Sequence, residues 1–304
     1  IIGALLFILT PCFLFYDRMA LMDSGITAGV IWMFFFSLLL ARTRRLDVAL
    51  VYGVITGFTL LGKSSVKLYA GVMITSGLYI LFSKKHSSLK EKVNPLVNFV
   101  FLYAVAMGLA ILMYNIQRLS PFFHYVTQKN TTFVLTTREL LQDPFQLFFA
   151  NSWRIPYYIF SEMGYVVGVL SLVGIWFVFK RERTFSLYFL SVWVLSFCAI
   201  AAVAKVLYPR YVQALGMLLL IPAAYYLSII KNKKLIIGIW TAIIVSVTYF
   251  HYTIIFVPSD IPFPQVDRGQ YLEGWPAGWG IKDIVEIARR DSRSQKVVLL
   301  AEGN

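Results

Sequence analysis

Short basic loops separate the long apolar runs of this chain, and they recur at every second gap between those runs. The loops hold Arg42, Arg44 and Arg45; Lys84, Lys85, Lys90 and Lys92; Lys180, Arg181 and Arg183; and Lys231, Lys233 and Lys234. Short loops rich in Lys and Arg resist translocation and stay on the cytoplasmic side of a membrane. The pattern therefore predicts a polytopic membrane protein whose remaining loops face the extracytoplasmic side.

The apolar runs are long enough to cross a membrane. Hydrophobic residues make up 59% of the chain and charged residues 14%, whereas soluble domains carry about 25% charged residues. The expected fold class is an all-α polytopic membrane protein with about nine transmembrane helices, of which the first, third and fourth are short. The predicted spans are 1–15, 24–41, 48–61, 68–82, 95–114, 157–179, 184–204, 212–230 and 235–257. The third and fourth could instead form one re-entrant hairpin around the Lys63 turn.

The net charge of +13 has its explanation in the same loops. In a soluble protein such a charge would favour a nucleic-acid partner. Here the cytoplasmic loops account for most of the excess positive charge. We therefore expect the protein to contact membrane lipids and not to bind nucleic acid. Cys12 and Cys198 lie in apolar segments, which indicates neither a disulfide framework nor a metal site.

We predict two domains, a transmembrane helical domain at 1–257 and the start of an extracytoplasmic soluble domain at 258–304. Loop 115–155 is the one long connection between spans, and it falls on the outer side. Its aromatic, amphipathic stretches predict helices that lie on the membrane interface.

The last part of the chain has a different character. Residues 258–270 are rich in Pro and predict a loop, the apolar spacing of 280–289 predicts a helix, and 296–300 predicts a short strand. A helix followed by a strand indicates the start of a small α/β domain. Because the chain begins inside an apolar run and ends just after this strand, we expect it to be a fragment that lacks N-terminal spans and the rest of that domain.

Asp23 lies where the second span begins, on the predicted outer side. The ordinary interpretation is a helix cap, because a carboxylate there accepts from free N–H groups and is favoured by the helix dipole. The functional interpretation is a carboxylate that binds a divalent cation or activates an acceptor hydroxyl. Arg18, beside Asp17, forms either a solvated turn pair or part of the same site.

Lys63 and Arg210 are cations on the outer side, against the positive-inside pattern. Lys63 could extend to lipid phosphates, and Arg210 with Tyr211 could belong to an aromatic belt at the membrane interface. Alternatively, cations from separate outer turns could build one phosphate site. On that hypothesis Lys63 and Arg210, with Arg18, converge on one outer cavity that opens to lipid.

Glu162 falls within the predicted span 157–179. An intramembrane carboxylate is costly and is a catalytic candidate by default. Its structural alternative is an ion pair with Arg154 or with another cation at the rim.

Three motifs together resemble a known family. They are the run 15–23 with Asp17, Arg18 and Asp23, the run 57–63 that ends in Gly62 and Lys63, and Tyr208-Pro209-Arg210-Tyr211 ahead of a long apolar span. In order, sidedness and spacing they resemble the GT-C glycosyltransferases of the protein-mannosyltransferase and aminoarabinose-transferase type. Residues 270–280 look like the junction to an outer domain in some bacterial members. One departure is that the usual Pro after the Arg-Tyr pair is replaced in 212–215.

The resemblance implies an enzyme of the bacterial cytoplasmic membrane that is active on the extracytoplasmic face. The donor would be a polyprenyl-phosphate sugar, and the acceptor a lipid, protein or glycan. The main catalytic carboxylate would lie upstream of Ile1. Asp23 would support it and would bind a Mg, Mn or Zn ion, and Arg18, Lys63, Arg210 and Tyr211 would bind substrate.

Two other classes of protein share the composition. A secondary transporter or lipid flippase would also be polytopic, but transporters show repeated halves and paired broken helices at the midplane, which this sequence does not indicate. A scaffold protein would have no need of charges at the outer rim.

Overall fold

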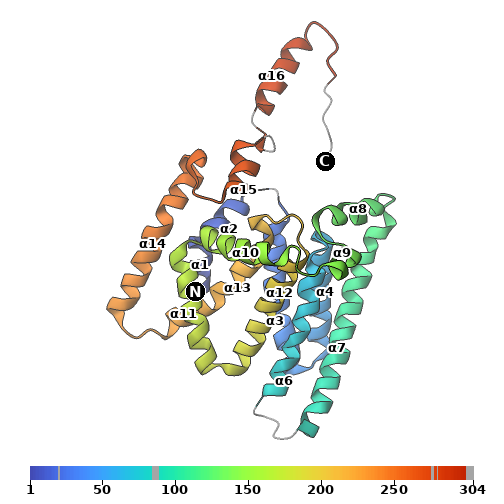
Figure 1. Cartoon of the computed structure of the whole chain (residues 1–304), viewed down its shortest axis with the longest axis vertical. Coiled ribbons are helices and arrows are strands. Elements are labelled where there is room, and N and C mark those ends of the chain that lie inside the picture. The colour runs from blue at the N-terminus through green and yellow to red at the C-terminus, as the bar shows by residue number, and fades with distance from the viewer. Residues whose placement is uncertain (20, 84–88, 275–276, 279, 299–304) are drawn as a thin grey trace.

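The computed structural model describes residues 1–19, 21–83, 89–274, 277–278 and 280–298. Helices make up almost all of this part of the chain (Figure 1). Within the described residues no strand forms. An isolated antiparallel β-bridge joins Val134 to Ala204. The all-α expectation is confirmed.

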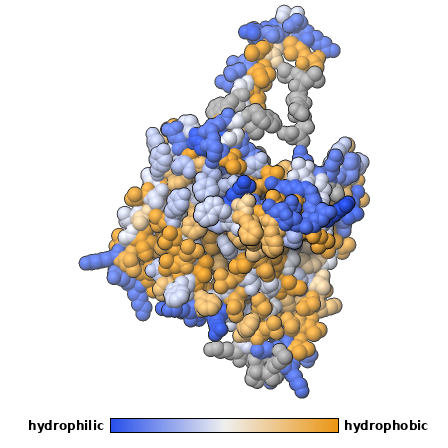
Figure 2. All heavy atoms as spheres, in the orientation of Figure 1, coloured by the Kyte–Doolittle hydropathy of each residue, from blue (hydrophilic) through white to orange (hydrophobic). Residues whose placement is uncertain are grey.

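Five described helices are long and apolar enough to cross a membrane, and a bent pair would make a sixth. The long elements are α3 (Asp23–Thr43), α7 (Leu89–Asn115), α12 (Arg183–Val203), α13 (Gln213–Ile229) and α14 (Lys233–Phe256). Many large apolar side chains on them face outward, such as Phe101 and Leu112 of α7. Figure 2 shows these side chains as an apolar zone around the bundle, with hydrophilic residues at its two ends. Such a surface suits lipid and not water.

The basic loops lie together at one end of the bundle. The turns after α3 and α13, and the turn between α11 (Tyr165–Arg181) and α12, are all at the end away from α16 (Ile281–Asp291) (Figure 1). The opposite end carries α8 (Phe123–Phe133), α9 (Thr137–Gln142) and the short helices after α14. We call this second end the outer rim.

Short helices also occur in the N-terminal part of the chain. α1 (Ile2–Leu9) and α2 (Pro11–Tyr16) meet at Thr10, and α4 (Leu46–Gly62) is followed by a segment of α5 (Val66–Val72), η1 (Met73–Gly77) and α6 (Leu78–Phe82). Figure 1 places α6 at the end of the bundle opposite the outer rim. The segment from α5 to α6 therefore runs along the bundle and does not turn back as a re-entrant hairpin.

Close contact between α4 and α7 explains one glycine in this region. A Cβ atom on Gly53 would lie 2.7 Å from the carbonyl oxygen of Ala106. Small residues let helices approach closely in membranes, where packing replaces the hydrophobic driving force.

The predicted span 157–179 is not one continuous helix. Its residues belong to two helices, α10 (Phe148–Met163) and α11, which meet at Gly164 with a bend of 114°. Gly164 has φ of 80°, a conformation that glycine adopts without steric cost. α10 lies across the outer rim (Figure 1), and the apolar run conceals this because both helices are apolar.

The C-terminal segment also differs from the prediction. Residues 258–270 are a loop only at 261–264. The rest of the range forms η4 (Pro258–Asp260), α15 (Gln265–Arg268) and the start of the π-helical turn η5 (Gly269–Glu273). The predicted helix at 280–289 is confirmed as α16. Residues 296–298 form no strand, and the rest of the predicted strand lies outside the described residues.

Candidate functional site

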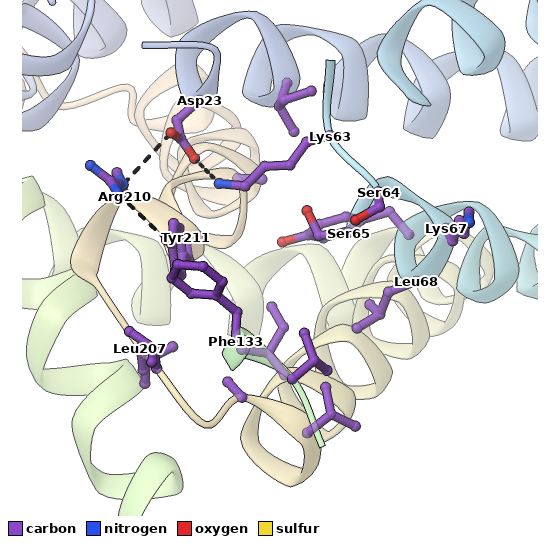
Figure 3. Close-up of a pocket in the computed structure, with 18 of the residues that line it drawn as sticks. Asp23, Lys63, Ser64, Ser65, Lys67, Leu68, Phe133, Leu207, Arg210 and Tyr211 are labelled. Carbon is purple, nitrogen blue, oxygen red and sulfur yellow. Dashed lines mark hydrogen bonds and ion pairs between the residues drawn. The ribbon is translucent and has the colours of Figure 1, made fainter. Parts of the chain in front are cut away.

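A cavity of about 490 Å³ lies at the outer rim, among the start of α3, the Lys63 turn and the segment between α12 and α13. Figure 3 shows Asp23, Lys63, Arg210 and Tyr211 pointing into the same space from these elements. Apolar side chains of the spans line the rest of it, including Ile26, Leu68 and Ile200. The cavity is therefore charged at one side and apolar at the other.

Asp23 joins the two cations. Its Oδ1 atom accepts a hydrogen bond from Lys63 Nζ at 2.6 Å, and its Oδ2 atom lies 3.8 Å from Arg210 Nε (Figure 3). The Asp23 side chain is 10% exposed, and α3 has no side-chain cap hydrogen bond. Asp23 therefore does not cap the helix through a side-chain hydrogen bond, although it lies in the first turn of α3, where the helix dipole favours a carboxylate.

Lys63 follows the last residue of α4 in an extended conformation, which carries its side chain across the cavity to Asp23. Its Nζ atom also lies 4.0 Å from the centroid of the Tyr211 ring. Lys63 therefore does not extend outward to lipid. Burial lowers the pKa of Lys63 below its ordinary value, and the ion pair with Asp23 counteracts that effect without cancelling it.

Arg210 sits in the turn η3 (Pro209–Val212), which Pro209 starts. Its guanidinium carbon lies 5.2 Å from the ring centroids of Tyr208 and Tyr211 and 5.7 Å from that of Tyr271. One NH group donates to the Tyr271 hydroxyl, whereas Nε is buried and has no hydrogen-bond partner among the described residues. Aromatic rings thus fix the guanidinium, and one of its donors remains free.

Residues of the outer loop, 115–155, form one wall of the cavity. Ser64 Oγ donates to Asn130 Oδ1 of α8 at 2.9 Å, and Leu135 N donates to Val203 O at 2.8 Å. These bonds join the Lys63 turn, the outer loop and the end of α12. The loop that we expected to lie on the membrane interface is therefore also part of the cavity wall.

The expectation that three cations converge is confirmed for two of them. Lys63 and Arg210 line one cavity, together with Tyr211. Arg18 does not: it is exposed, and its guanidinium lies 3.5 Å from the carbonyl oxygen of Ile254 on α14. Lys67, which was not among the predicted substrate-binding residues, lines the cavity instead.

Glu162 lies outside this cavity, at the end of α10 and 3% exposed. Within the described residues it forms no ion pair, with Arg154 or any other cation. Its Oε1 atom accepts a hydrogen bond from the Tyr16 hydroxyl at 3.0 Å, and the same hydroxyl contacts Asp267. No signal in the sequence indicated Asp267 or Tyr271, which fall in the segment interpreted as a loop and a junction.

The side chains around Asp23 do not fit a divalent metal ion. Two cations occupy its carboxylate, and in the described part of the chain no group of three or more His, Cys, Asp or Glu residues is placed to hold a metal. A metal would have to displace Lys63. The Mg, Mn or Zn ion stays a prediction without a ligand set.

The arrangement suits an amphipathic anion. Lys63, Lys67 and Arg210 outnumber Asp23 in the cavity, and guanidinium and ammonium groups bind phosphate oxygens through charge-assisted hydrogen bonds. Comparisons of this chain with protein families, curated proteins and solved structures find no match. The likeness to GT-C glycosyltransferases therefore continues to rest on its residue motifs.

Proposed function

We propose that this chain is part of a membrane glycosyltransferase that moves a sugar from a polyprenyl-phosphate donor to a lipid, protein or glycan on the extracytoplasmic side. One observation carries the proposal: Lys63 and Arg210, which come from separate turns, meet in a cavity whose remaining lining is mostly apolar. A polyprenyl phosphate has the same two halves, an anionic phosphate and a long apolar chain.

In this reaction Lys63 and Arg210 bind the donor phosphate. The acceptor hydroxyl attacks the anomeric carbon and gives its proton to the catalytic carboxylate that the resemblance places upstream of Ile1. The bond from that carbon to the phosphate oxygen breaks, and negative charge develops on the leaving phosphate. Fixed cations stabilise such a charge most strongly where the surroundings exclude water. The tyrosine rings around Arg210 hold it in place before the donor arrives, so little reorganisation accompanies the step.

Asp23 has a supporting role in the proposal. It holds the two cations side by side without a ligand, since their mutual repulsion would otherwise separate them. When phosphate binds, Asp23 is released from part of this pairing and becomes available to orient the acceptor hydroxyl. Glu162 has no part in the proposed reaction, because it lies outside the cavity.

The proposed topology has nine crossings in the cytoplasmic membrane. They are α1 with α2, α3, α4, α5 to α6, α7, α11, α12, α13 and α14. The basic loops would lie in the cytoplasm and the cavity outside. The segment from Pro258 onward would begin an outer domain, whose α/β nature also remains a proposal.

One observation favours a transporter or flippase instead. The break between α10 and α11 at Gly164 gives a discontinuous helix, a feature of many transporters. In transporters such breaks line a site near the middle of the bilayer and occur in pairs, whereas this one lies at the outer rim. Sugar transfer is therefore the better-supported function.

The test uses the complete natural protein in proteoliposomes with a radiolabelled polyprenyl-phosphate sugar and acceptor lipids or glycans. We expect the label to move covalently to the acceptor. Lys63→Gln and Arg210→Gln should abolish most of this transfer, whereas Lys129→Gln, at an exposed position of α8 outside the cavity, is the matched control. Movement of the intact donor between leaflets without covalent transfer would show a flippase.

A further inference from the structure

A second buried cluster lies behind the cavity, where three distant segments meet. Tyr16 of α2 is fully buried, Glu162 of α10 is 3% exposed and Asp267 of α15 is 1% exposed. The Tyr16 hydroxyl lies 3.0 Å from Glu162 Oε1 and hydrogen-bonds Asp267 Oδ2. The two carboxyl groups are also close enough to hydrogen-bond each other.

The cluster has too few protons if both carboxyl groups are ionised. The Tyr16 hydroxyl has a single proton, so it can donate to only one of the two carboxylates. Asp267 Oδ1 is buried and has no hydrogen-bond partner among the described residues. Two adjacent ionised carboxylates without water would repel each other, and such pairs hold one proton between them.

No cation in the surroundings replaces that proton. The titratable and charged groups that face the cluster are Cys12 of α2, Tyr158 of α10, Arg210 of η3 and Tyr271 of η5. Arg210 is the nearest cation, and among the described residues its ion pair is with Asp23. The other three groups are neutral at ordinary pH.

We propose that Glu162 and Asp267 share one proton and that this proton fastens the segment Gln265–Glu273 to the outer rim as a latch. Asp267 is then a positioning residue for Arg210. It does not touch the cavity, but it fixes the segment whose Tyr271 accepts a hydrogen bond from Arg210.

Internal hydrogen bonds hold the segment together, which is why one attachment point matters. Arg268 donates to the carbonyl oxygens of Ile261 at 2.8 Å and Ser259 at 2.7 Å, and to Glu273 Oε1 at 2.7 Å. Phe15 of the rim packs against this unit, with the Tyr271 ring 5.8 Å from its own. If Asp267 leaves its place, Tyr271 must therefore shift relative to Arg210.

The latch should weaken as the pH rises. Burial raises the pKa of Asp267 above its ordinary value, so the proton binds more tightly in the latched state than in the released state. The latch is therefore complete at low pH and is lost as the pH rises through this raised pKa. Asp267→Asn keeps the shape and needs no shared proton, so it should stay latched at high pH.

Limited trypsin digestion tests the latch in the complete protein. We would compare cleavage after Arg268, inside the latch, with cleavage after Arg289, exposed in α16. In the wild type the Arg268 to Arg289 ratio should rise as the pH passes through the raised pKa of the buried pair, by up to about tenfold per pH unit once the shared proton is lost. In Asp267→Asn and Glu162→Gln the ratio should stay low.

Three results would overturn the latch. They are a wild-type ratio that does not change with pH, an Asp267→Asn protein that follows the wild type or is cleaved at Arg268 at every pH, and a wild-type latch that EDTA opens and Mg²⁺ closes. The last would show a cation in place of the proton.

The expected effect of the latch on sugar transfer rests on the proposed function, whereas the outcome of the trypsin digestion does not. If the chain is a transferase, the wild type should lose transfer at alkaline pH and Asp267→Asn should retain it to higher pH. If no transfer occurs at any pH, the proposed function fails and the digestion result still decides the latch.

Discussion

The cavity cluster and the latch cluster lie side by side at the outer rim, and they neutralise buried carboxyl groups in different ways. In the cavity, Asp23 is paired with Lys63 and Arg210. In the latch, Glu162 and Asp267 both contact the Tyr16 hydroxyl, and in the proposal they share one proton. An ion pair can exchange one partner for a ligand of the same charge. A shared proton cancels one of the two negative charges and links the two carboxyl groups to each other, so it joins one part of the protein to another.

The two clusters also differ in solvent exposure. The Lys63 side chain is 30% exposed and that of Asp23 10%, so water and a phosphate can reach the ion pair. Glu162 and Asp267 are almost fully buried. The cluster that we propose to bind substrate is thus the accessible one, and the cluster that we propose to hold structure is closed.

The largest expected effect is at Arg210. Arg210→Met keeps bulk against the tyrosines but removes the charged donors, and hydrogen bonds to charged groups contribute about 1.5–3 kcal/mol each. Affinity for polyprenyl phosphate should fall roughly 10- to 100-fold, measured by binding in detergent micelles. Lys129→Gln is the control, and equal affinity in Arg210→Met would remove the donor-phosphate site from this cavity.

Asp23→Asn should change the pH dependence of binding. Asp23 raises the pKa of Lys63, which burial lowers, so without the carboxylate the ammonium loses its proton at lower pH. Phosphate binding, which needs the ammonium, should then be lost at a lower pH than in the wild type. The measurement is the pH profile of polyprenyl-phosphate affinity. Identical profiles would mean that Asp23 and Lys63 are not coupled.

Tyr16→Phe should weaken the latch without touching the cavity. It removes the hydroxyl that two buried carboxyl groups share, and an unsatisfied buried polar group costs about 1–3 kcal/mol. At neutral pH, cleavage after Arg268 should increase relative to Arg289, while polyprenyl-phosphate affinity changes much less than in Arg210→Met. A larger loss of affinity than of protection would contradict the separation of the two clusters.

The smallest effect belongs to an exposed pair on the same rim. Lys205 Nζ lies 2.8 Å from Glu139 Oε1, and together with the Thr136 hydrogen bonds it lowers the pKa of Glu139 to about 2. This stabilisation is lost only as the pH falls through about 2, so it is constant where the latch titrates. Lys205→Gln should leave the thermal midpoint in detergent and the Arg268 cleavage profile unchanged, because exposed ion pairs contribute little. A pH-dependent change would show that the latch is not the source of the alkaline effect.

The sequence by itself determined the properties that depend on hydropathy and charge averaged over a short stretch of chain. Hydropathy over a window of about 20 residues sets which segments can lie in lipid, and the basic loops distinguish one end of the bundle from the other. Even the meeting of Lys63 and Arg210 followed from this, because two turns on the same side of a bundle are confined to one small surface.

Tertiary structure alone decided the bend at Gly164, the outward position of Arg18 and the latch. Hydropathy averaged over a window does not depend on the backbone angle of a single residue. The apolar run 157–179 therefore conceals a change of direction of 114°. Tyr16 is 146 residues from Glu162 and 251 from Asp267 along the chain. No local pattern links such positions, because their contact exists only after the helices have packed and brought the two carboxyl groups to the same hydroxyl.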